Sequence, residues 1–469
     1  MTQKSIGVQQ QSVDLRAEIG ELQVAETHLQ LQLVELRARK SGLYHQLTNT
    51  EAAIGRMPDE VLAEIFRHLE GGWDDDLPFL VRASHVTRRW RSVVLSIPSL
   101  WSAIELRPTN RSHLYRTHLI NEYLARSGAS LLDIEFHICE NQDVTPAVGL
   151  LIPQISRWLR LVVESADEPA VRTLVLALRN LSAPCLEHLQ IDLEIDDEQN
   201  QSVWRGENHT LAGGVPSLKF LGTRGINMQH WLPPLGGVKS VYMADCYSAT
   251  LLSYSRFREI LTALTSLTHL ELEGMINCSP EDDVTLIEMP SLVSLCVLPP
   301  DYVNPIPYMR NIFTAISAPS LRTLCLRKVY GKQFAVFLET FRNASWHPVL
   351  ETLVLESVTG LEHLTSRFAL SSPTITHLSL KFTDPAPVLK LLAGRNIDSL
   401  WPQLQTLTVG PVDNGLLRSF ISDRILAGRP LVKLRYATDS RAAFNNLPAN
   451  EMSWFVERLR VENVSYHDM

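Results

Sequence analysis

The sequence predicts an α/β solenoid, a horseshoe of stacked strand-and-helix units, preceded by a small three-helix domain and an N-terminal heptad helix. Three patterns predict this order along the 469 residues. Leucines first recur at seven-residue spacing, a short stretch of helical apolar faces follows, and one phrase then repeats through most of the chain. The predicted boundaries are 1–50 for the heptad helix, 54–105 for the three-helix domain, 106–436 for the solenoid and 437–469 for a capping segment.

The N-terminal helix is predicted from leucines that each stand seven residues after the one before, namely Leu15, Leu22, Leu29, Leu36 and Leu43. A seven-residue apolar repeat is typical of a coiled coil. Glu26 and Lys40 interrupt the second seam, and polar residues at such positions can fix register or partner choice. Two interpretations stay open: self-association through residues 8–50, or a single amphipathic helix folded back on the next domain.

The three-helix domain is predicted over residues 57–101. Pro58 suits the first turn of a helix, because its missing N–H is not needed there. The apolar face of that helix recurs at three- and four-residue spacing through Val61, Leu62, Ile65, Phe66 and Leu69. Glycines at 71 and 72 end the helix, and Asp76 is a candidate cap for the second one.

The third helix of this domain is predicted from Val86, Trp90, Val93 and Val94, which share one face. Three arginines, Arg88, Arg89 and Arg91, flank the tryptophan. We expect all three to point to solvent, because a charged side chain is rarely buried without a partner. Pro98 ends the helix.

The solenoid is predicted from the phrase Pro-x-Leu-x-x-Leu-x-Leu, for example APSLRTLCL from residue 318. The first apolar position of each copy falls at residues 131, 158, 186, 218, 238, 267, 292, 321, 350, 375, 404 and 431. The mean spacing of about 27 residues lies within the leucine-rich-repeat range, whose unit is a strand plus a helix or turn. The sequence therefore predicts about twelve units. The asparagine that usually follows the strand is missing, so the turns must satisfy their backbone groups in another way.

Two further segments are distinct in the sequence. The acidic insertion at 192–210, which contains Trp204, is either a binding loop or a solvated bulge. In the last segment Met452, Phe455, Val456 and Leu459 form one apolar helix face, which predicts a cap on the end of the solenoid.

The composition and motifs exclude several classes of function. The net charge of −8 lowers the expectation of nucleic-acid binding, and the first residues and apolar runs predict neither a secretory signal nor a membrane span. The six cysteines form no CxxC pair, and no phosphate loop, GxSxG or HExxH motif occurs. We therefore expect a chain without enzymatic activity, cofactor or metal, in the cytoplasm and/or nucleus.

Residues 57–101 resemble an F-box. That family's pattern is matched in order and spacing by Met57, Pro58, Glu60, Leu62, Ile65, Phe66, Val86, Arg89, Trp90, Leu100 and Trp101. Met57 stands where leucine is usual, Thr87 where cysteine is common, and the linker GGWDDD is longer and more acidic than in the family. Together with the heptad helix and the repeats, the chain resembles fungal F-box proteins with leucine-rich repeats.

The resemblance implies a substrate-recognition subunit of an SCF-type ubiquitin ligase. In that family the F-box docks on a Skp-type adaptor, through it on a cullin scaffold, and the repeats bind a target protein. The resemblance gives the adaptor-contact role to Met57, Pro58, Leu62, Ile65, Phe66, Val86, Trp90 and Trp101. Such a chain acts by proximity and needs no catalytic residue. The alternatives are a leucine-rich-repeat scaffold without ubiquitin chemistry, and a sensor of a small molecule, for which the sequence has no pocket signal.

The strand period of two predicts which residues the repeats expose opposite their apolar side. We expect the substrate-binding residues among them to be His188, Tyr242, His269, Glu271, Glu273, Arg327, His377, Lys381 and Arg435. Gln190, Asp192 and Lys433 share this face, which is then acidic in its first half and basic in its second. A target of complementary charge is one interpretation, and charges that only solubilise the sheet are the other.

Overall fold

The structure of the chain is a computed structural model, which describes residues 28–44, 54, 57–69, 78–107, 117–194, 210–226, 232–245, 252–274, 276–277, 286–300, 305–343, 349–364, 366–393, 400–410, 412–438 and 449–465. It contains two compact units, Met1–Trp101 and Ser102–Met469, which we describe separately. No helix in the described ranges is long and apolar enough to cross a membrane.

The first unit is helical. One helix covers residues 28–44, which is the described part of the predicted heptad segment. Three short helices and a 3-10 turn follow: α2 (Asp59–Leu69), α3 (Phe79–Ser84), α4 (Arg88–Ser96) and η2 (Pro98–Trp101). Thr87 caps α4, because its hydroxyl accepts a hydrogen bond of 3.1 Å from the backbone N–H of Trp90. Asp76 and the rest of the GGWDDD linker lie outside the described residues.

The second unit is built on one 14-stranded parallel sheet whose strands follow one another in chain order. Its strands are β1 (Ala103–Leu106), β2 (Leu132–Ile138), β3 (Trp158–Ser165), β4 (His188–Leu193), β5 (Phe220–Arg224), β6 (Ser240–Asp245), β8 (His269–Gly274), β11 (Ser294–Leu298), β13 (Thr323–Arg327), β14 (Thr352–Glu356), β15 (His377–Lys381), β16 (Thr406–Val409), β17 (Lys433–Thr438) and β18 (Arg460–Ser465). Two small sheets pair β7 (Leu252–Ser253) with β9 (Ile276–Asn277) and β10 (Ile287–Glu288) with β12 (Ile316–Ser317).

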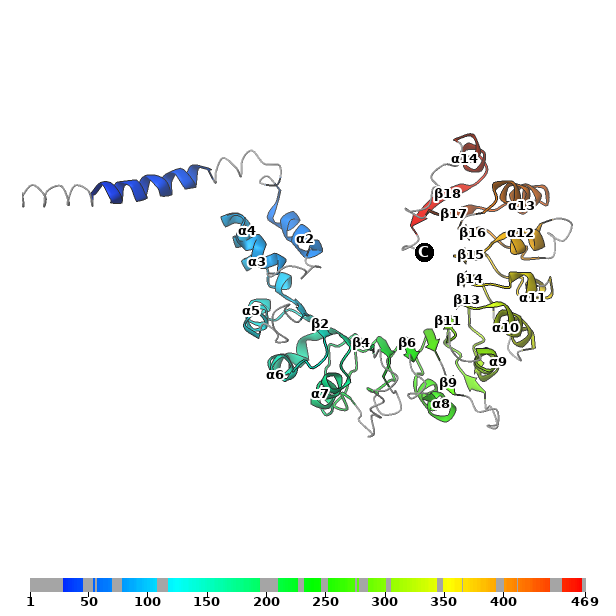
Figure 1. Cartoon of the computed structure of the whole chain (residues 1–469), viewed down its shortest axis with the longest axis horizontal. Helices are drawn as coiled ribbons and strands as arrows, with labels where there is room; N and C mark the ends of the chain where they lie inside the picture. Colours follow the sequence, from blue (N-terminus) through cyan, green and yellow to red (C-terminus); the bar gives the residue numbers. More distant parts are fainter. Residues whose placement is uncertain are drawn as a thin grey trace, which may run out of the picture. The chain divides into compact units, whose positions relative to one another are not determined.

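Helices are found in most of the connections between strands and lie along one face of the sheet (Figure 1). They are α5 (Thr117–Ser127), α6 (Thr145–Leu151), η3 (Ile152–Arg157), α7 (Glu168–Leu178), α8 (Tyr254–Ala263), α9 (Pro305–Ala315), α10 (Gly331–Asn343), η5 (Leu361–His363), α11 (Ser366–Ser371), α12 (Ala386–Leu392), α13 (Asn414–Leu426) and α14 (Ala449–Val456). Within the described part of the unit, the other face of the sheet carries no helix, and we call it the open face.

The repeat pattern locates the strands closely. Each of the twelve predicted positions from 131 to 431 lies at the start of one sheet strand or up to two residues before it, from β2 to β17. The sheet is longer than predicted, since β1 lies largely within the predicted three-helix domain and β17 runs past residue 436. The predicted capping segment contributes α14 and also β18, which pairs in parallel with β17.

The missing asparagine ladder is replaced by backbone hydrogen bonds. After the strands, the Lys328 N–H donates to the Glu356 carbonyl and the Ser357 N–H donates to the Lys381 carbonyl of the next unit, each at 2.8 Å. Before the strand, the repeat leucine closes a four-residue turn, as where the Leu321 N–H donates to the Ala318 carbonyl at 3.0 Å, with Pro319 at the second position, where type I turns favour proline. Direct backbone hydrogen bonds between units therefore join the segments after the strands, and turns, several of them with proline, precede the strands.

The interior of the second unit lies between the sheet and its helices. The repeat leucines, such as Leu321 and Leu350, are fully buried there. Among the polar side chains buried with them, Arg424 of α13 donates hydrogen bonds to the carbonyls of Trp401, Leu404 and Arg429. Burial, with the nearby Arg429 charge, lowers the pKa of Arg424 to about 10.

Candidate functional site

The core of the first unit is aromatic. The Phe66 ring lies 4.9 Å from the Trp90 ring and 5.9 Å from the Phe79 ring, between centroids, so it joins α2, α3 and α4. Trp101 of η2 is also buried and donates its indole N–H to the Val94 carbonyl at 2.8 Å. Buried indole groups need such a partner, and this one fixes the end of the unit against α4.

Helix α2 uses only half of its predicted apolar face inside the unit. Leu62 and Phe66 are fully buried, and Ile65 is half-buried. Val61 is 44% exposed and Leu69 is 53% exposed. Val61, Ile65 and Leu69 stand four residues apart and therefore form one stripe on the helix surface. We call these three residues the outer stripe.

The eight residues predicted to contact an adaptor divide in the same way. Leu62, Phe66 and Trp101 are buried within the unit, so in this structure they pack its core. Pro58 is exposed, and Met57, Ile65 and Trp90 are half-buried. Val86 is 54% exposed, because it lies in the turn before α4 and not on that helix.

Arg89 corrects one expectation. The sequence predicted that it points to solvent, but its guanidinium donates to Asp59 at 2.7 Å and to the carbonyl of Met57. The basic position before Trp90 therefore ties the start of α2 to α4 and helps to orient the outer stripe. The signal that sequence reasoning missed is the pairing of Asp59 with an arginine 30 positions later.

All nine residues predicted to bind a substrate lie on the open face, because they alternate along their strands with buried leucines. The charges on the strands follow the predicted polarity. From β1 to β8 the open-face acids are Glu105, Asp133, Glu135, Glu164, Asp192, Glu271 and Glu273, and the arginines are Arg160 and Arg224. From β11 to β18 the bases are Arg327, Lys381, Lys433, Arg435 and Arg460, and the acids are Glu356 and Glu462.

Several of these residues are brought together across strands. Tyr242 donates its hydroxyl hydrogen to Glu273 at 2.6 Å, and Arg224 contacts both. Burial, followed by the Glu273 carboxylate, raises the pKa of Tyr242 above its usual value. Arg327 contacts Glu271 and lies 3.4 Å from Glu356. These side chains therefore form paired groups and not isolated charges.

The other residues of the open face differ in how tightly they pack. The His188 ring stacks on Phe220 with centroids 4.2 Å apart, and burial, together with the Arg160 charge, lowers its pKa. Burial raises the pKa of the neighbouring Asp192, which accepts a hydrogen bond from Gln190. His269 and His377 are exposed, as is Arg435, which pairs with Glu462 at 3.3 Å. Glu462 belongs to β18, which the sequence did not predict.

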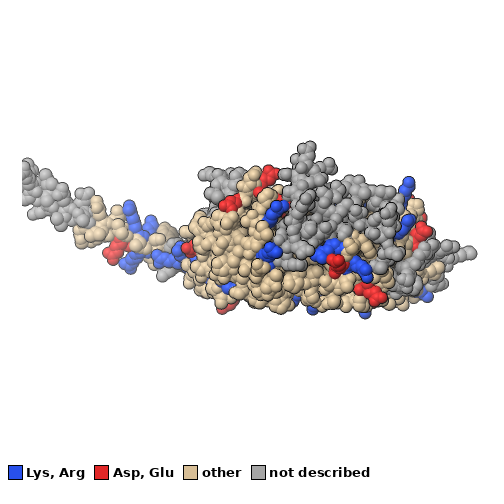
Figure 2. All heavy atoms as spheres, turned by 90° about the horizontal axis from the view of Figure 1, so that it is seen from below, with Lys and Arg blue, Asp and Glu red and all other residues tan. Residues whose placement is uncertain are grey.

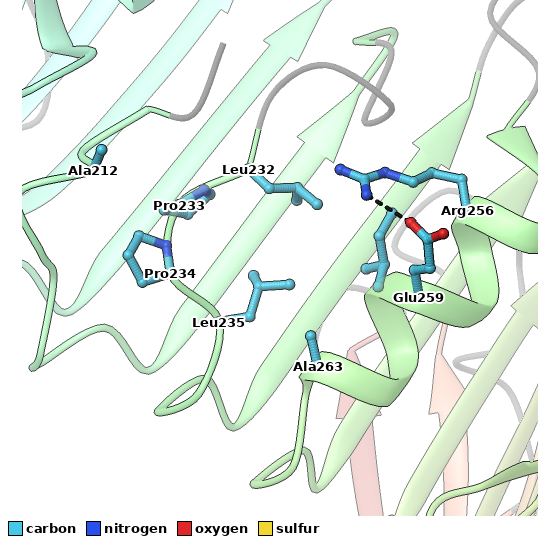
Figure 3. Close-up of a pocket in the computed structure, with 9 residues that line it drawn as sticks. Ala212, Leu232, Pro233, Pro234, Leu235, Arg256, Glu259 and Ala263 are labelled. Carbon is cyan, nitrogen blue, oxygen red and sulfur yellow. Dashed lines mark hydrogen bonds and ion pairs between the residues drawn. The ribbon is translucent and has the colours of Figure 1, made fainter. Parts of the chain in front are cut away.

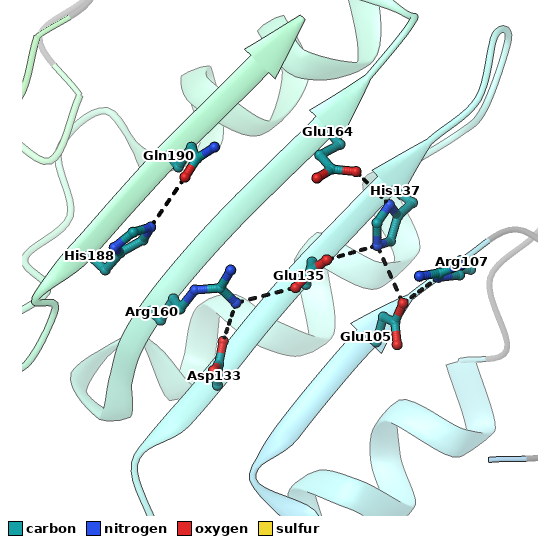
Figure 4. A network of polar contacts seen from close by, with 9 residues as sticks. All are labelled: Glu105, Arg107, Asp133, Glu135, His137, Arg160, Glu164, His188 and Gln190. Atoms are coloured by element: carbon teal, nitrogen blue, oxygen red, sulfur yellow. Dashed lines mark hydrogen bonds and ion pairs between the residues drawn. The ribbon is translucent and has the colours of Figure 1, made fainter. Parts of the chain in front are cut away.

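The sequence did not predict a network of ion pairs and hydrogen bonds that joins the first three strands (Figure 4). Arg160 of β3 donates to Asp133 at 2.9 Å and to Glu135 at 3.2 Å. His137 of β2 lies within ion-pair distance of Glu105, Glu135 and Glu164. Its hydrogen bond with Glu105 raises the pKa of His137, against the opposing effect of burial. The alternation LDIEFHI in β2 is the sequence signal that could have placed these residues on the open face.

A cavity of about 440 Å³ lies beside α8 (Figure 3), in the range typical of small-molecule sites. Leu232, Leu235 and Ile260 are among its lining residues. Its two charged side chains, Arg256 and Glu259, are paired with each other at 2.8 Å. On the face of the molecule in Figure 2, charged side chains of both signs are scattered over the described residues, and no large patch of one sign gathers there.

Comparison with known proteins bears on the first unit. No curated protein shows significant similarity to the chain. Residues 54–107 match the model of one protein family, described as F-box-like. The matched range covers α2, α3, α4, η2 and β1, so it includes the aromatic core and the outer stripe. The chain therefore carries an F-box-like domain at residues 54–107, followed by a large parallel sheet with helices.

Proposed function

We propose that the protein is the substrate-recognition subunit of an SCF-type ubiquitin ligase. Its F-box-like domain docks on a Skp-type adaptor and through it on a cullin scaffold, and its sheet binds a target protein. The observation that carries the proposal is the F-box-like match together with the outer stripe of α2, which is apolar and partly exposed. A partner that covers such a stripe gains the free energy of removing it from water.

The docking surface consists of the exposed part of the domain. Val61, Ile65 and Leu69 lie on α2, with Pro58 at its start and Val86 in the turn before α4. Leu62, Phe66 and Trp101 support this surface from the core. Each fully buried aliphatic side chain contributes about 1.5–3 kcal/mol, so a few residues of the stripe are enough for a specific interaction.

The second unit presents the target-binding surface. We propose that it is a leucine-rich-repeat horseshoe and that its open face reads a target with basic groups toward β1–β8 and acidic groups toward β11–β18. The supporting observations are the repeat period, the parallel strands and the change of charge along the open face. In this function the chain positions its target beside an enzyme bound elsewhere and performs no chemistry itself.

The test of docking uses residues whose replacement leaves the core intact. The full chain and its Val61→Asp/Leu69→Asp variant are titrated with a purified Skp-type adaptor by calorimetry. We expect the variant to lose at least about 100-fold in affinity, because two apolar contacts become two desolvated carboxylates. Leu426→Asp, at the exposed end of α13, is the matched control and keeps full affinity. Equal binding by the double variant and the wild type contradicts the proposed docking surface.

A second arm separates ligase function from a scaffold without ubiquitin chemistry. The tagged wild-type chain is expected to co-purify with both the adaptor and the cullin, and the double variant with neither. Proteins that stay bound to the double variant are candidate targets. Their binding is then measured to chains that carry charge reversals at Glu271, Glu273, Lys381 and Arg435. Target binding that survives all four reversals shows that the open face is not the reading surface.

A further inference from the structure

Three side chains converge at the first edge of the sheet. Glu105 of β1 and Glu135 of β2 are directly paired in register, and His137 lies two residues further along β2. The Nε2 atom of His137 lies 3.0 Å from Oε1 of Glu135 and 3.4 Å from Oε1 of Glu105. One ligand atom from each of the three residues lies within 4.8 Å of the other two. All three side chains are mostly buried, so their positions are restricted by their neighbours.

The two distances from the imidazole nitrogen lie near those between ligand atoms around a tetrahedral zinc ion. Zn–N and Zn–O bonds of about 2.0–2.2 Å at tetrahedral angles place neighbouring ligand atoms about 3.3–3.5 Å apart. Both distances from the imidazole nitrogen are close to that value. One imidazole and two carboxylates also form a three-ligand set of the kind zinc takes, with a fourth position left for water.

The second nitrogen of the same ring has the partner that a metal-binding histidine needs. Nδ1 of His137 lies 3.0 Å from a carboxylate oxygen of Glu164 in β3. When Nδ1–H donates to that carboxylate, the lone pair of Nε2 points toward Glu105 and Glu135 (Figure 4). Glu164 therefore fixes the tautomer and ring orientation from outside the ligand set.

The charges around the three residues also favour a divalent cation. Four carboxylates, of Glu105, Asp133, Glu135 and Glu164, face two guanidiniums, of Arg107 and Arg160 (Figure 4). With a neutral imidazole the group carries two excess negative charges. Arg160 contacts Oε2 of Glu135 and leaves Oε1 on the side of His137. Arg107 contacts Oε1 of Glu105. The Arg107 side chain is partly exposed, so it can turn to solvent when an ion binds.

We propose that Glu105, Glu135 and His137 bind one zinc ion, with Glu164 as the positioning residue of the imidazole. The ion joins β1, the edge strand, to β2 and so holds the start of the sheet together. This proposal is based on the geometry of these four residues, and it does not depend on whether the F-box-like domain docks on an adaptor.

The test is a calorimetric titration of the full chain with ZnCl2 at pH 8, after removal of metals with a chelator. We expect one zinc ion per chain in the tightest class of sites. The His137→Ala and Glu135→Gln variants should lose this tightest zinc site. The Glu164→Gln variant should bind zinc there about 10- to 100-fold more weakly, as is usual when a hydrogen-bond partner of a metal ligand is removed. His363→Ala, which removes an exposed histidine from η5, retains it and controls for binding by the other histidines.

A second readout follows the expected cross-link. Zinc should slow hydrogen exchange of the β1 amides in the wild type and in His363→Ala, and leave it unchanged in His137→Ala. Circular dichroism of each variant without zinc checks that the sheet is formed. Equal zinc affinity for the wild type and His137→Ala, or no zinc-dependent protection of β1, overturns the proposal.

Discussion

The helix at residues 28–44 and helix α2 have similar sequence patterns, but they differ in how much of their apolar face is buried. In α2, Leu62 and Phe66 are fully buried against α4 and its neighbours. In the helix at 28–44 the seam leucines Leu29, Leu36 and Leu43 are 63%, 62% and 59% exposed. Both patterns correctly predict a helix with one apolar face.

The difference teaches that periodicity specifies a face but not what covers it. The face of α2 is wider than the contact available inside its unit, so the outer stripe is left over. The seam of the helix at 28–44 is narrow and repeats every seven residues, which fits a second helix of the same kind. Two experiments can break or sharpen this comparison, and a third extends it to the open face of the sheet.

The largest effect is expected where the chain itself covers the apolar face. Phe66→Asp places an unpaired charge among Phe79 and Trp90 and removes the central ring, which should cost about 5 kcal/mol or more and unfold the F-box-like domain. Ile65→Asp, half-buried on the outer stripe, should cost much less. Tryptophan fluorescence and limited proteolysis compare the two variants. If Phe66→Asp is as resistant to protease as Ile65→Asp, the assignment of core and stripe is wrong.

A change in assembly is expected where no described part of the chain covers the leucines. If the seam pairs two chains, Leu29→Glu/Leu36→Glu/Leu43→Glu should abolish self-association of the full chain and leave its unfolding unchanged, because these leucines are exposed in the described chain. Sedimentation velocity over a range of concentrations measures the change. Leu31→Glu/Val34→Glu alters exposed residues outside the seam and serves as the matched control. A wild type that is monomeric at every concentration contradicts the coiled-coil interpretation.

The smallest change in stability is expected on the open face, where the half-buried group is the polar carboxyl of Asp192. Burial raises the pKa of Asp192 in the folded chain. A raised carboxyl pKa contributes stability at low pH that is lost as the pH rises through the folded value. Asp192→Asn should therefore stabilise the chain at pH 7 by about 1 kcal/mol or less, with little effect at pH 3. Urea unfolding at both values measures this difference.

The control for this experiment is a carboxylate in a surface ion pair. Glu187→Gln removes an exposed contact with Lys219, at 2.6 Å, and should change stability by less than about 1 kcal/mol at either pH. A gain at pH 7 for this variant equal to that of Asp192→Asn shows that the effect is one of net charge and not of burial.

The sequence by itself determined the elements of the chain. The helical spacing of Val61 to Leu69 predicted α2, and the repeat positions predicted the starts of twelve strands, because the side-chain period is a local consequence of backbone geometry. Alternation within the strands also placed His188, Glu271 and Lys381 on the open face.

Only the tertiary structure decided how these elements combine. Burial of Leu62 beside an exposed Val61 depends on the width of the α2–α4 contact, and the clamp from Arg89 to Asp59 joins residues 30 positions apart. The convergence of Glu105 with His137 depends on the register between β1 and β2. A sequence pattern carries the direction of a side chain along its own element, whereas distances between elements are set by packing, which no single stretch of residues contains.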